Sequence, residues 1–249
     1  MNKRTISSRK LVTSAMLGAI TIVLSLTPLG LIPLGLINAT TMHIPVIIGA
    51  IAEGPLVGAL VGLIFGVSSL LNALIRNPSP VSFVFYNPII SVLPRILIGI
   101  TSYYAYRACT KINSDKLKGL AKVLWFAIAL ALVYLLINNI RAGKSTMNMI
   151  FVGVLLLVVI GLFIYSQKSA KGDFPIAIGA FVGSMTNTIL VLGGIYLIYA
   201  EKYVTTLGIP MDSARSAILG VTITSGIPEA ILSVILSTAV IKAIKSSRR

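Results

Sequence analysis

The stretch Leu56-Val-Gly-Ala-Leu-Val-Gly-Leu-Ile-Phe-Gly-Val-Ser-Ser-Leu-Leu-Asn-Ala-Leu74 contains no charged side chain. The hydrocarbon core of a bilayer is about 30 Å thick and an α-helix rises about 1.5 Å per residue, so this stretch predicts one membrane-spanning helix. Four glycines follow one another at every fourth position: Gly54, Gly58, Gly62 and Gly66. Such a stripe favours close packing against a neighbouring helix of the same chain.

Similar apolar runs extend along the whole sequence. Of the 249 residues, 56% are hydrophobic and only 11% are charged, and the mean hydropathy is +0.97; a soluble domain has about 25% charged residues. We predict an all-α, polytopic transmembrane helix bundle that forms a single integral membrane domain over residues 1–249. Its eight predicted spans cover about 11–27, 38–52, 56–74, 88–107, 120–140, 147–165, 174–199 and 214–241.

Two features of the chain set the expected topology. The apolar segment Pro28–Gly35 is rich in proline and glycine, so we expect a re-entrant or membrane-capping loop there. The formal net charge of +15 comes from basic residues that lie between apolar runs, a pattern typical of the positive-inside rule rather than of a nucleic-acid-binding protein. With both termini in the cytoplasm, the outer side keeps only six of the 21 basic residues: Arg76, Arg95, Arg141, Lys144, Lys202 and Arg215.

Two ionisable residues stand out because they lie deep within predicted spans. Arg95 is about two turns into the fourth span, and Glu229 is near the middle of the last. A charge at membrane depth costs a few kcal/mol unless it is paired or faces a wet cavity. Two interpretations remain open: a structural ion pair between these residues, or an Arg95 that binds a carboxylate or phosphate of a substrate.

Further polar side chains are expected at a similar depth or in the adjoining outer loop. Asn187 lies between two threonines, and Thr224 precedes a Gly-Ile-Pro-Glu segment that loosens the last helix. The histidine His43 has no companion ligand for a metal, so interhelical hydrogen bonding and substrate contact both remain possible for it. The predicted substrate-binding set is His43, Asn72, Tyr86, Asn87, Arg95, Asn187, Thr224 and Glu229.

The sequence contains no motif for catalysis or for nucleotide binding. No phosphate-binding Gly-x-x-x-x-Gly-Lys-Ser/Thr loop, zinc-protease helix motif or nucleophile elbow is present. A single histidine and the single cysteine Cys109 do not make a metal cluster or an internal disulfide. We therefore expect a binding protein without a cofactor or metal, not an enzyme.

Several of these stretches, taken in order, resemble the S components of energy-coupling factor (ECF) transporters, the substrate-binding membrane subunits of bacterial vitamin importers. They are Ala15-x-x-x-Ala19, Thr41-Met-His-Ile-Pro-Val-Ile-Ile-Gly-Ala50 with Glu53-Gly-Pro-x-x-Gly58, Pro94-Arg-Ile-Leu-Ile-Gly99 and Gly183-Ser-Met-Thr-Asn-Thr188. Within the family they are most similar to the pantothenate-type branch. The resemblance implies a bacterial cell-membrane protein that captures a vitamin, with pantothenate favoured, from outside.

The resemblance also implies partners. Ala15 and Ala19 would contact the transmembrane coupling subunit, and two cytoplasmic ATPase subunits would supply the energy. S components usually have six spans, so residues 1–112 and 172–249 would form the core and residues 119–166 an inserted transmembrane hairpin on its periphery. The alternative is a self-sufficient, ion-coupled secondary transporter of a small organic solute, although no internal repeat and no second deep carboxylate favour it.

Overall fold

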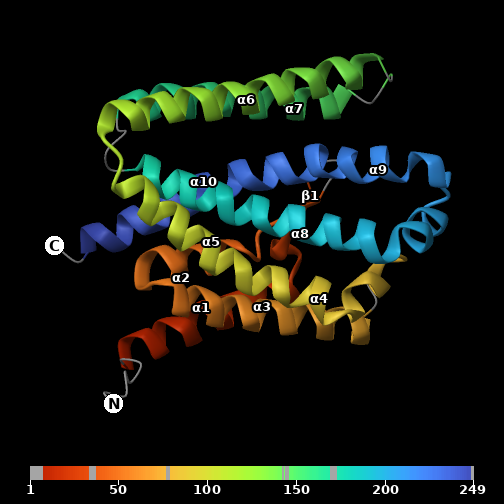
Figure 1. Cartoon of the computed structure of the whole chain (residues 1–249), viewed down its shortest axis with the longest axis horizontal. Coiled ribbons are helices and arrows are strands. Elements are labelled where there is room, and N and C mark those ends of the chain that lie inside the picture. The colour runs from red at the N-terminus through yellow and green to blue at the C-terminus, as the bar shows by residue number, and fades with distance from the viewer. Residues whose placement is uncertain are drawn as a thin grey trace.

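The structure is a computed structural model that describes residues 8–33, 38–76, 79–141, 143, 146–168 and 173–247 (Figure 1). The end of the predicted loop at Pro28–Gly35 and part of the turn of the predicted hairpin lie outside these residues. The α-helices are α1 (Ser8–Leu26), α2 (Ile44–Glu53), α3 (Pro55–Arg76), α4 (Pro88–Ser91), α5 (Leu93–Thr110), α6 (Ser114–Arg141), α7 (Thr146–Lys168), α8 (Phe174–Thr206), α9 (Ala214–Val221) and α10 (Ile227–Ser247).

The predicted all-α transmembrane bundle is confirmed. Within the described part of the chain, six helical segments are long and apolar enough to cross a membrane: Ser8–Leu26, Pro55–Arg76, Pro88–Thr110, Asp115–Arg141, Phe174–Thr206 and Met211–Ser247. The two remaining predicted spans correspond to the shorter apolar helices Ile44–Glu53 and Val152–Ile164, the latter within α7. The first residue of α1 and the last of α10 lie at the same end of the bundle (Figure 1).

The segment between α1 and α2 forms a small hairpin. A 3₁₀ turn at Pro28–Gly30 leads into strand β1 (Leu31–Pro33), which pairs antiparallel with β2 (Asn38–Thr40) in the register Ile32 to Ala39. The sequence prediction that a helix starts at Asn38 is therefore wrong, because this residue pairs in a strand. The ten residues of α2 rise only about 15 Å, which is less than the roughly 30 Å thickness of the hydrocarbon core of a bilayer.

The predicted glycine stripe packs α3 against α5. A Cβ atom added at Gly58 would lie 2.9 Å from Gly99 Cα, and one added at Gly62 would lie 2.2 Å from Arg95 O. The two backbones are thus too close for any side chain at these positions, which confirms the packing role expected for the stripe. Gly54, with φ of 107°, makes the tight turn between α2 and α3.

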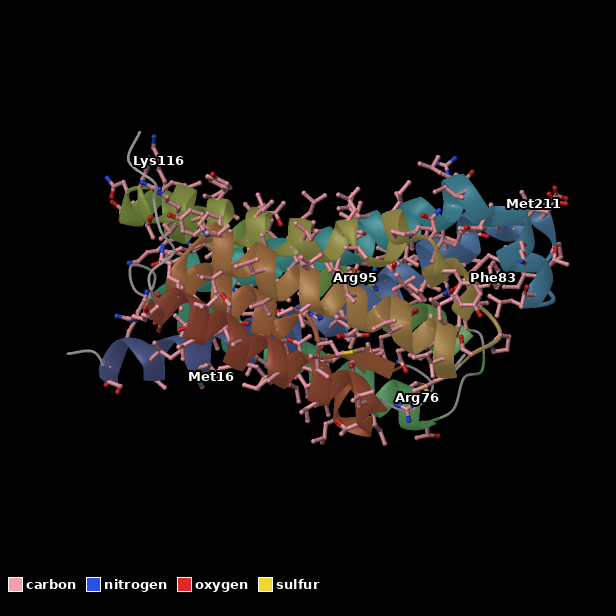
Figure 2. The ribbon with its side chains drawn as sticks, turned by 90° about the horizontal axis from the view of Figure 1, so that it is seen from below. Met16, Arg76, Phe83, Arg95, Lys116 and Met211 are labelled. Carbon is pink, nitrogen blue, oxygen red and sulfur yellow. The ribbon has the colours of Figure 1, made fainter. Side chains whose placement is uncertain are left out.

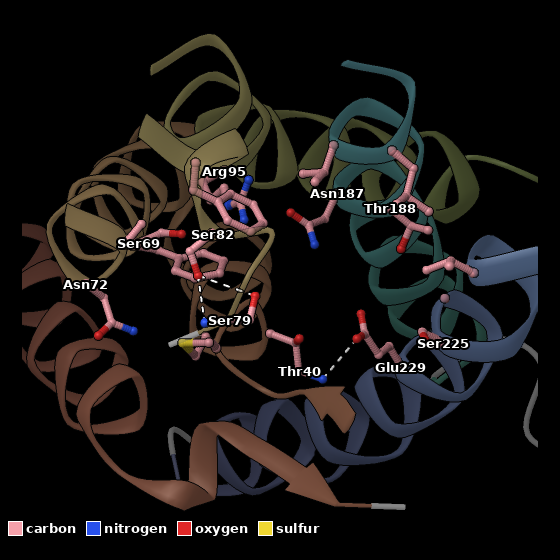
Figure 3. A pocket seen from close by; sticks show the side chains of 18 residues that line it. Thr40, Ser69, Asn72, Ser79, Ser82, Arg95, Asn187, Thr188, Ser225 and Glu229 are labelled. Atoms are coloured by element: carbon pink, nitrogen blue, oxygen red, sulfur yellow. Dashed lines mark hydrogen bonds between the residues drawn. The ribbon is translucent and has the colours of Figure 1, made fainter. Parts of the chain in front are cut away.

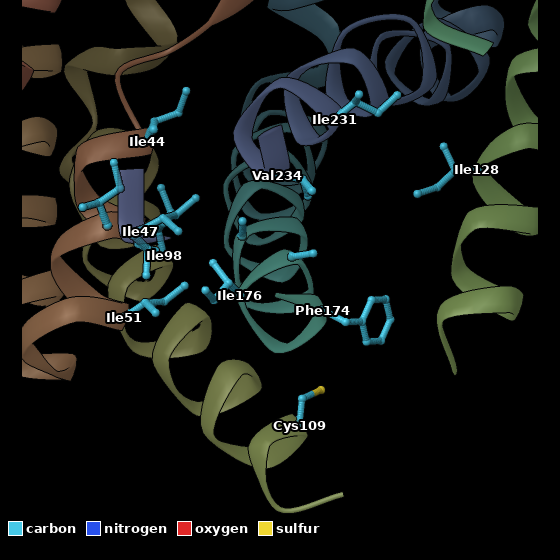
Figure 4. Packing of buried hydrophobic residues seen from close by; sticks show 14 of the residues in the cluster. Ile44, Ile47, Ile51, Ile98, Cys109, Ile128, Phe174, Ile176, Ile231 and Val234 are labelled. Carbon is cyan, nitrogen blue, oxygen red and sulfur yellow. The ribbon is translucent and has the colours of Figure 1, made fainter. Parts of the chain in front are cut away.

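The apolar core lies between α2, α5, α8 and α10 (Figure 4). Ile47, Ile98, Ile176 and Val234 contribute to it from these four helices, and each is at most 2% exposed. Helices α6 and α7 run side by side on the outside of α8 and α10 (Figure 1). One face of α6 is buried, through residues three or four apart: Leu117, Ala121, Trp125, Ile128, Leu132 and Leu135.

Candidate functional site

A cavity of about 390 Å³ lies within the bundle, enclosed by α3, α5, α8, the hairpin segment and the start of α10 (Figure 3). Its polar lining consists of Thr40, Ser69, Asn72, Ser79, Ser82, Arg95, Asn187, Thr188, Ser225 and Glu229. Its apolar lining consists of Met42, Phe65, Ala73, Phe85, Val191, Leu192 and Val221, with Gly226. Pockets that bind small molecules measure roughly 300–1000 Å³ and combine an apolar wall with a few polar groups, so both size and lining suit a small organic ligand.

Arg95 is held in the first turn of α5 by a local feature of the sequence. Pro94 has no N–H group, so it cannot donate a helical hydrogen bond to the carbonyl of Ile90, four residues earlier. Arg95 Nη1 donates to that carbonyl oxygen instead. The proline that begins α5 thus leaves free the acceptor that fixes the arginine side chain. Figure 2 shows Arg95 in the interior, between the end with Lys116 and the end with Phe83 and Met211.

The guanidinium group of Arg95 is also confined by two aromatic rings. Its Cζ atom lies 5.3 Å from the centroid of the Phe65 ring and 5.2 Å from that of the Phe85 ring. Arg95 is 5% exposed, and its Nε has no hydrogen-bond partner among the described residues. With Nη1 bound to Ile90 O, the edge formed by Nε and Nη2 has no hydrogen-bond partner among the described residues, and Arg95 is one of the residues that line the cavity.

Glu229 lies on another wall of the cavity, in the first turn of α10, and is 8% exposed. Its Oε1 accepts a hydrogen bond from the backbone N–H of Thr40 at 3.0 Å. The last helix is thereby connected to β2, so the hairpin segment covers part of the cavity (Figure 3). Both Glu229 and Arg95 are described, and no ion pair joins their side chains.

A π-helical turn, Thr222–Gly226, precedes α10 and contributes lining residues. Gly226 allows close approach to α8, since a Cβ atom there would lie 2.7 Å from Thr188 Cγ2. Such π-helical turns are rare and frequent at functional sites. Here the widened turn brings Val221 and Ser225 to the cavity.

Four of the eight predicted substrate-binding residues line the cavity: Asn72, Arg95, Asn187 and Glu229. Asn72 Oδ1 and Asn187 Oδ1 are buried acceptors without a hydrogen-bond partner among the described residues. Two acceptors on different helices, α3 and α8, are therefore available to a ligand that carries hydrogen-bond donors.

The other four predicted residues lie outside the cavity lining. Asn87 caps α4, with its Oδ1 accepting from Ile89 N at 2.9 Å, and Tyr86 is 41% exposed beside it. Thr224 Oγ1 donates to Gly220 O of its own helix at 2.9 Å. His43 is fully buried at the start of α2, and neither ring nitrogen has a hydrogen-bond partner among the described residues.

Several lining residues were not singled out as binding residues from the sequence. Ser69 lies one turn before Asn72 on α3, a helical spacing that places both on one face. The loop between α3 and α4 contributes Ser79, Ser82 and Phe85. Serine and aromatic residues occur in many loops that bind no ligand. The spacing from Asn72 was the available signal for Ser69, whereas the loop residues carried none.

The loop also contacts the C-terminal part of α8. Lys202 Nζ lies 4.4 Å from the centroid of the Phe83 ring, and the Phe83 and Tyr199 rings meet edge to face at 5.8 Å. Tyr199 has non-helical backbone angles, so α8 kinks where the loop packs on it. These contacts hold the loop that carries Ser82 and Phe85 against the cavity.

The predicted docking residues Ala15 and Ala19 are both exposed on α1. A neighbouring face of the helix is buried through Ser14, Gly18 and Thr21. Ala15 and Ala19 thus lie on the outer surface of the bundle. Among the described residues, no group of three or more His, Cys, Asp or Glu side chains is placed to hold a metal ion.

The fold and the cavity together define a polytopic helical membrane protein with an internal polar site. A family model described as "ECF transporter, substrate-specific component" matches residues 9–143, more than half of the sequence. The chain therefore belongs to the family of substrate-specific components of ECF transporters, which confirms the resemblance recognised in the sequence. It is the substrate-binding subunit of an ECF-type importer.

One curated relative is the Pantothenic acid transporter PanT of Lactococcus lactis subsp. cremoris (strain MG1363). It is 26% identical to this chain over 227 residues, which cover 85% of this chain and 80% of the relative. The similarity extends well beyond the segment that the family model matches.

Proposed function

We propose that this chain binds pantothenate, or a closely related small acid, in the cavity between α3, α5, α8 and α10. The observation that carries the proposal is the confined Arg95 guanidinium, which presents one unoccupied edge to the cavity. Pantothenate has a carboxylate at one end, a central amide and two hydroxyl groups towards the other end. The name of the Lactococcus relative supports this choice of substrate.

Arg95 supports an acidic ligand for an electrostatic reason. Removal of a cation from water is strongly unfavourable unless an anion or several hydrogen bonds compensate, and here a carbonyl and two aromatic rings are the neighbours. A carboxylate can accept two parallel hydrogen bonds from Nε and Nη2. Lysine cannot provide that geometry, so the proposal requires arginine at position 95.

The remaining substrate contacts proposed here are hydrogen bonds. Asn187 and Asn72 each offer a buried acceptor without a partner among the described residues, and Glu229 offers a carboxylate. His43 follows the lining residue Met42 in the sequence. We therefore propose that His43 positions Met42 and does not itself contact the ligand. Tyr86, Asn87 and Thr224 would act in the same indirect way through the loop and the π-helical turn.

The proposed transport cycle uses partner subunits. The substrate enters from outside, and a transmembrane coupling subunit with two cytoplasmic ATPases drives its delivery, with Ala15 and Ala19 on α1 as the docking face. The chain itself makes no chemical change to the substrate and needs no cofactor. The self-sufficient carrier considered from the sequence is less well supported, because the family consists of transporter components.

We further propose a bacterial cell-membrane location with both termini in the cytoplasm. The starts of α1 and α6 and the ends of α5 and α10 carry many of the described basic residues, including Arg9, Lys111, Lys118 and Lys245. Cytoplasmic segments are enriched in lysine and arginine. The end of the bundle that carries Phe83 and Met211 would then face outside (Figure 2).

The pair α6–α7 is proposed to be a peripheral hairpin rather than part of the binding core. No side chain that the structure describes on either helix lines the cavity. Its outer surface is apolar, with Val123, Phe126 and Leu157 each at least 69% exposed, as expected for contact with lipid. The family match ends at residue 143, so it includes α6 and does not by itself separate the hairpin from the core.

The direct test is native mass spectrometry of detergent-purified protein from cells grown in rich medium. One bound pantothenate per chain would support the proposal. A protein without bound ligand, whose Tm also does not change when vitamins are added in thermal-shift assays, would favour the ion-coupled carrier. The residue-level test is Arg95→Gln in isothermal titration calorimetry. We expect at least about a tenfold loss of affinity, roughly 1.4 kcal/mol.

The matched control is Arg215→Gln, since Arg215 is exposed on α9 and outside the cavity. It should bind pantothenate as the wild type does. If folded Arg95→Gln binds pantothenate normally, the proposed acid site is wrong. If Arg95→Gln fails to fold while Arg215→Gln is intact, the result favours a structural role for Arg95 over the proposed acid site.

A further inference from the structure

We propose that the cavity accepts its acid in one orientation only, with the carboxylate at Arg95 and an uncharged, hydrogen-bond-donating end at Glu229. Glu229 is then a specificity-determining residue that excludes ligands with a second negative charge at that end. This inference rests on the proposed function. It goes further by naming the chemical analogues of the substrate that the cavity does not bind.

Two walls of the cavity have opposite chemical character. Arg95 projects from α5 and Glu229 from α10, on separate walls of the lining (Figure 3). No ion pair joins these two described residues, so neither charge neutralises the other by direct contact. A cation on one wall and a carboxylate on another form a dipolar site, and an elongated ligand with one acidic end has a single favourable direction in it.

A hydrogen bond holds the Glu229 carboxylate in position. Its Oε1 accepts from Thr40 N at 3.0 Å, and Gly226 and Thr188, which approach each other closely, line the same cavity. A carboxylate has about four lone-pair sites, and one backbone N–H occupies only one of them. The rest of the acceptor capacity serves hydroxyl groups of a ligand.

Two further lining residues also favour a ligand that donates hydrogen bonds. Asn72 Oδ1 and Asn187 Oδ1 are buried acceptors with no partner among the described residues. Buried acceptors that stay unpaired are unfavourable, so a ligand with an amide N–H or hydroxyl groups gains from meeting them. A phosphate group has no donor to offer when ionised.

A consequence is discrimination against phosphate esters of the substrate. Phosphorylation of the terminal hydroxyl places about −1.5 to −2 charges at the end that meets Glu229. Like charges in juxtaposition strongly disfavour a complex, so we expect this ester to bind at least about a hundredfold more weakly than pantothenate. The reversed pose is no remedy, because it leaves the carboxylate of the ligand against Glu229.

The experiment combines ligand analogues with variants in isothermal titration calorimetry on the purified full chain. Four ligands are compared. They are pantothenate, the analogue in which a hydroxymethyl group replaces the carboxylate, the phosphate ester of the terminal hydroxyl of pantothenate, and an uncharged carbamate ester of that same hydroxyl. The proteins are the wild type, Arg95→Gln, Glu229→Gln and the control Glu201→Gln, which changes an exposed carboxylate on α8. The carbamate separates the effect of size from that of charge.

Single orientation predicts which pairs of changes are coupled. The alcohol analogue should bind the wild type at least about tenfold more weakly than pantothenate, and Arg95→Gln should weaken it no further. Glu229→Gln keeps an oxygen for Thr40 N and adds an amide donor, so it should improve the affinity for the phosphate ester relative to pantothenate by at least about tenfold. Glu201→Gln should match the wild type for every ligand.

Three results would overturn the inference. One is a phosphate ester that binds the wild type as tightly as the carbamate ester, a comparison that needs no folded variant. Another is a Glu229→Gln protein with an unchanged preference between pantothenate and the phosphate ester. The third is an alcohol analogue whose loss of affinity is coupled to Glu229 instead of Arg95. A fourth result, a wild-type protein that binds no pantothenate, would instead refute the proposed substrate. Failure of the proposed function is therefore distinguishable from failure of this inference.

Discussion

Substitution of Gly62 by alanine tests whether the α3–α5 contact sets the position of the acid site. The added Cβ atom would lie 2.2 Å from Arg95 O, whereas ordinary contacts are 3.4 Å or longer. The two helices must therefore separate by about 1 Å at this level, and overpacking of this kind typically costs about 1–3 kcal/mol of stability.

The same displacement moves the backbone that carries Arg95. A bidentate pair between guanidinium and carboxylate needs distances of about 2.7–2.9 Å, so a shift of about 1 Å breaks at least one of its hydrogen bonds. Hydrogen bonds to charged groups contribute about 1.5–3 kcal/mol, which corresponds to a loss of roughly 10- to 100-fold in pantothenate affinity.

The assay is isothermal titration calorimetry with pantothenate, with a thermal-shift measurement on the same preparations. Gly193→Ala on α8 is the control, because its added Cβ meets no atom within 4 Å. We expect normal binding and an unchanged or higher Tm for the control. A Gly62→Ala protein with wild-type affinity and wild-type Tm would refute the argument that this helix contact positions Arg95.

Two further predictions concern the outer surfaces of the bundle. Replacement of Ala15 and Ala19 by leucine should leave pantothenate binding intact but stop uptake by cells, since both residues are exposed on α1 and neither lines the cavity. A loss of pantothenate binding by the purified variant would argue against a docking role. Deletion of residues 119–166 should change the affinity by less than about threefold, under 1 kcal/mol. A still-folded deletion protein without binding would show that the hairpin supports the site.

The helices could be predicted from the sequence because their signals are local. Length and hydropathy alone identify a span, and the stripe at Gly58, Gly62 and Gly66 indicates close packing without naming the partner helix. Arg95 and Glu229 stood out for a related reason: a charge at membrane depth is costly enough to need an explanation. The ion pair left open by the sequence is absent between these two described residues.

The parts that sequence reasoning missed depend on tertiary contacts. The strand pairing of Leu31–Pro33 with Asn38–Thr40 follows a proline- and glycine-rich segment whose composition fits many loops. Serine is equally ambiguous, because its hydroxyl often bonds to its own helix. Ser82 lines the cavity whereas Thr224 donates to Gly220 O, and nothing in their immediate neighbours separates these two outcomes.

The hydrogen bond from Thr40 N to Glu229 Oε1 joins residues that are 189 positions apart in the sequence. Ribosomes add about 5–20 residues per second, so Glu229 is synthesised roughly 10–40 s after β2. The wall of the cavity that contains this hydrogen bond cannot form earlier. The binding site is therefore among the last features to form during biogenesis. Ligand binding then reports that the whole chain, including its final helix, has been inserted, and a chain arrested before α10 would have no site to occupy.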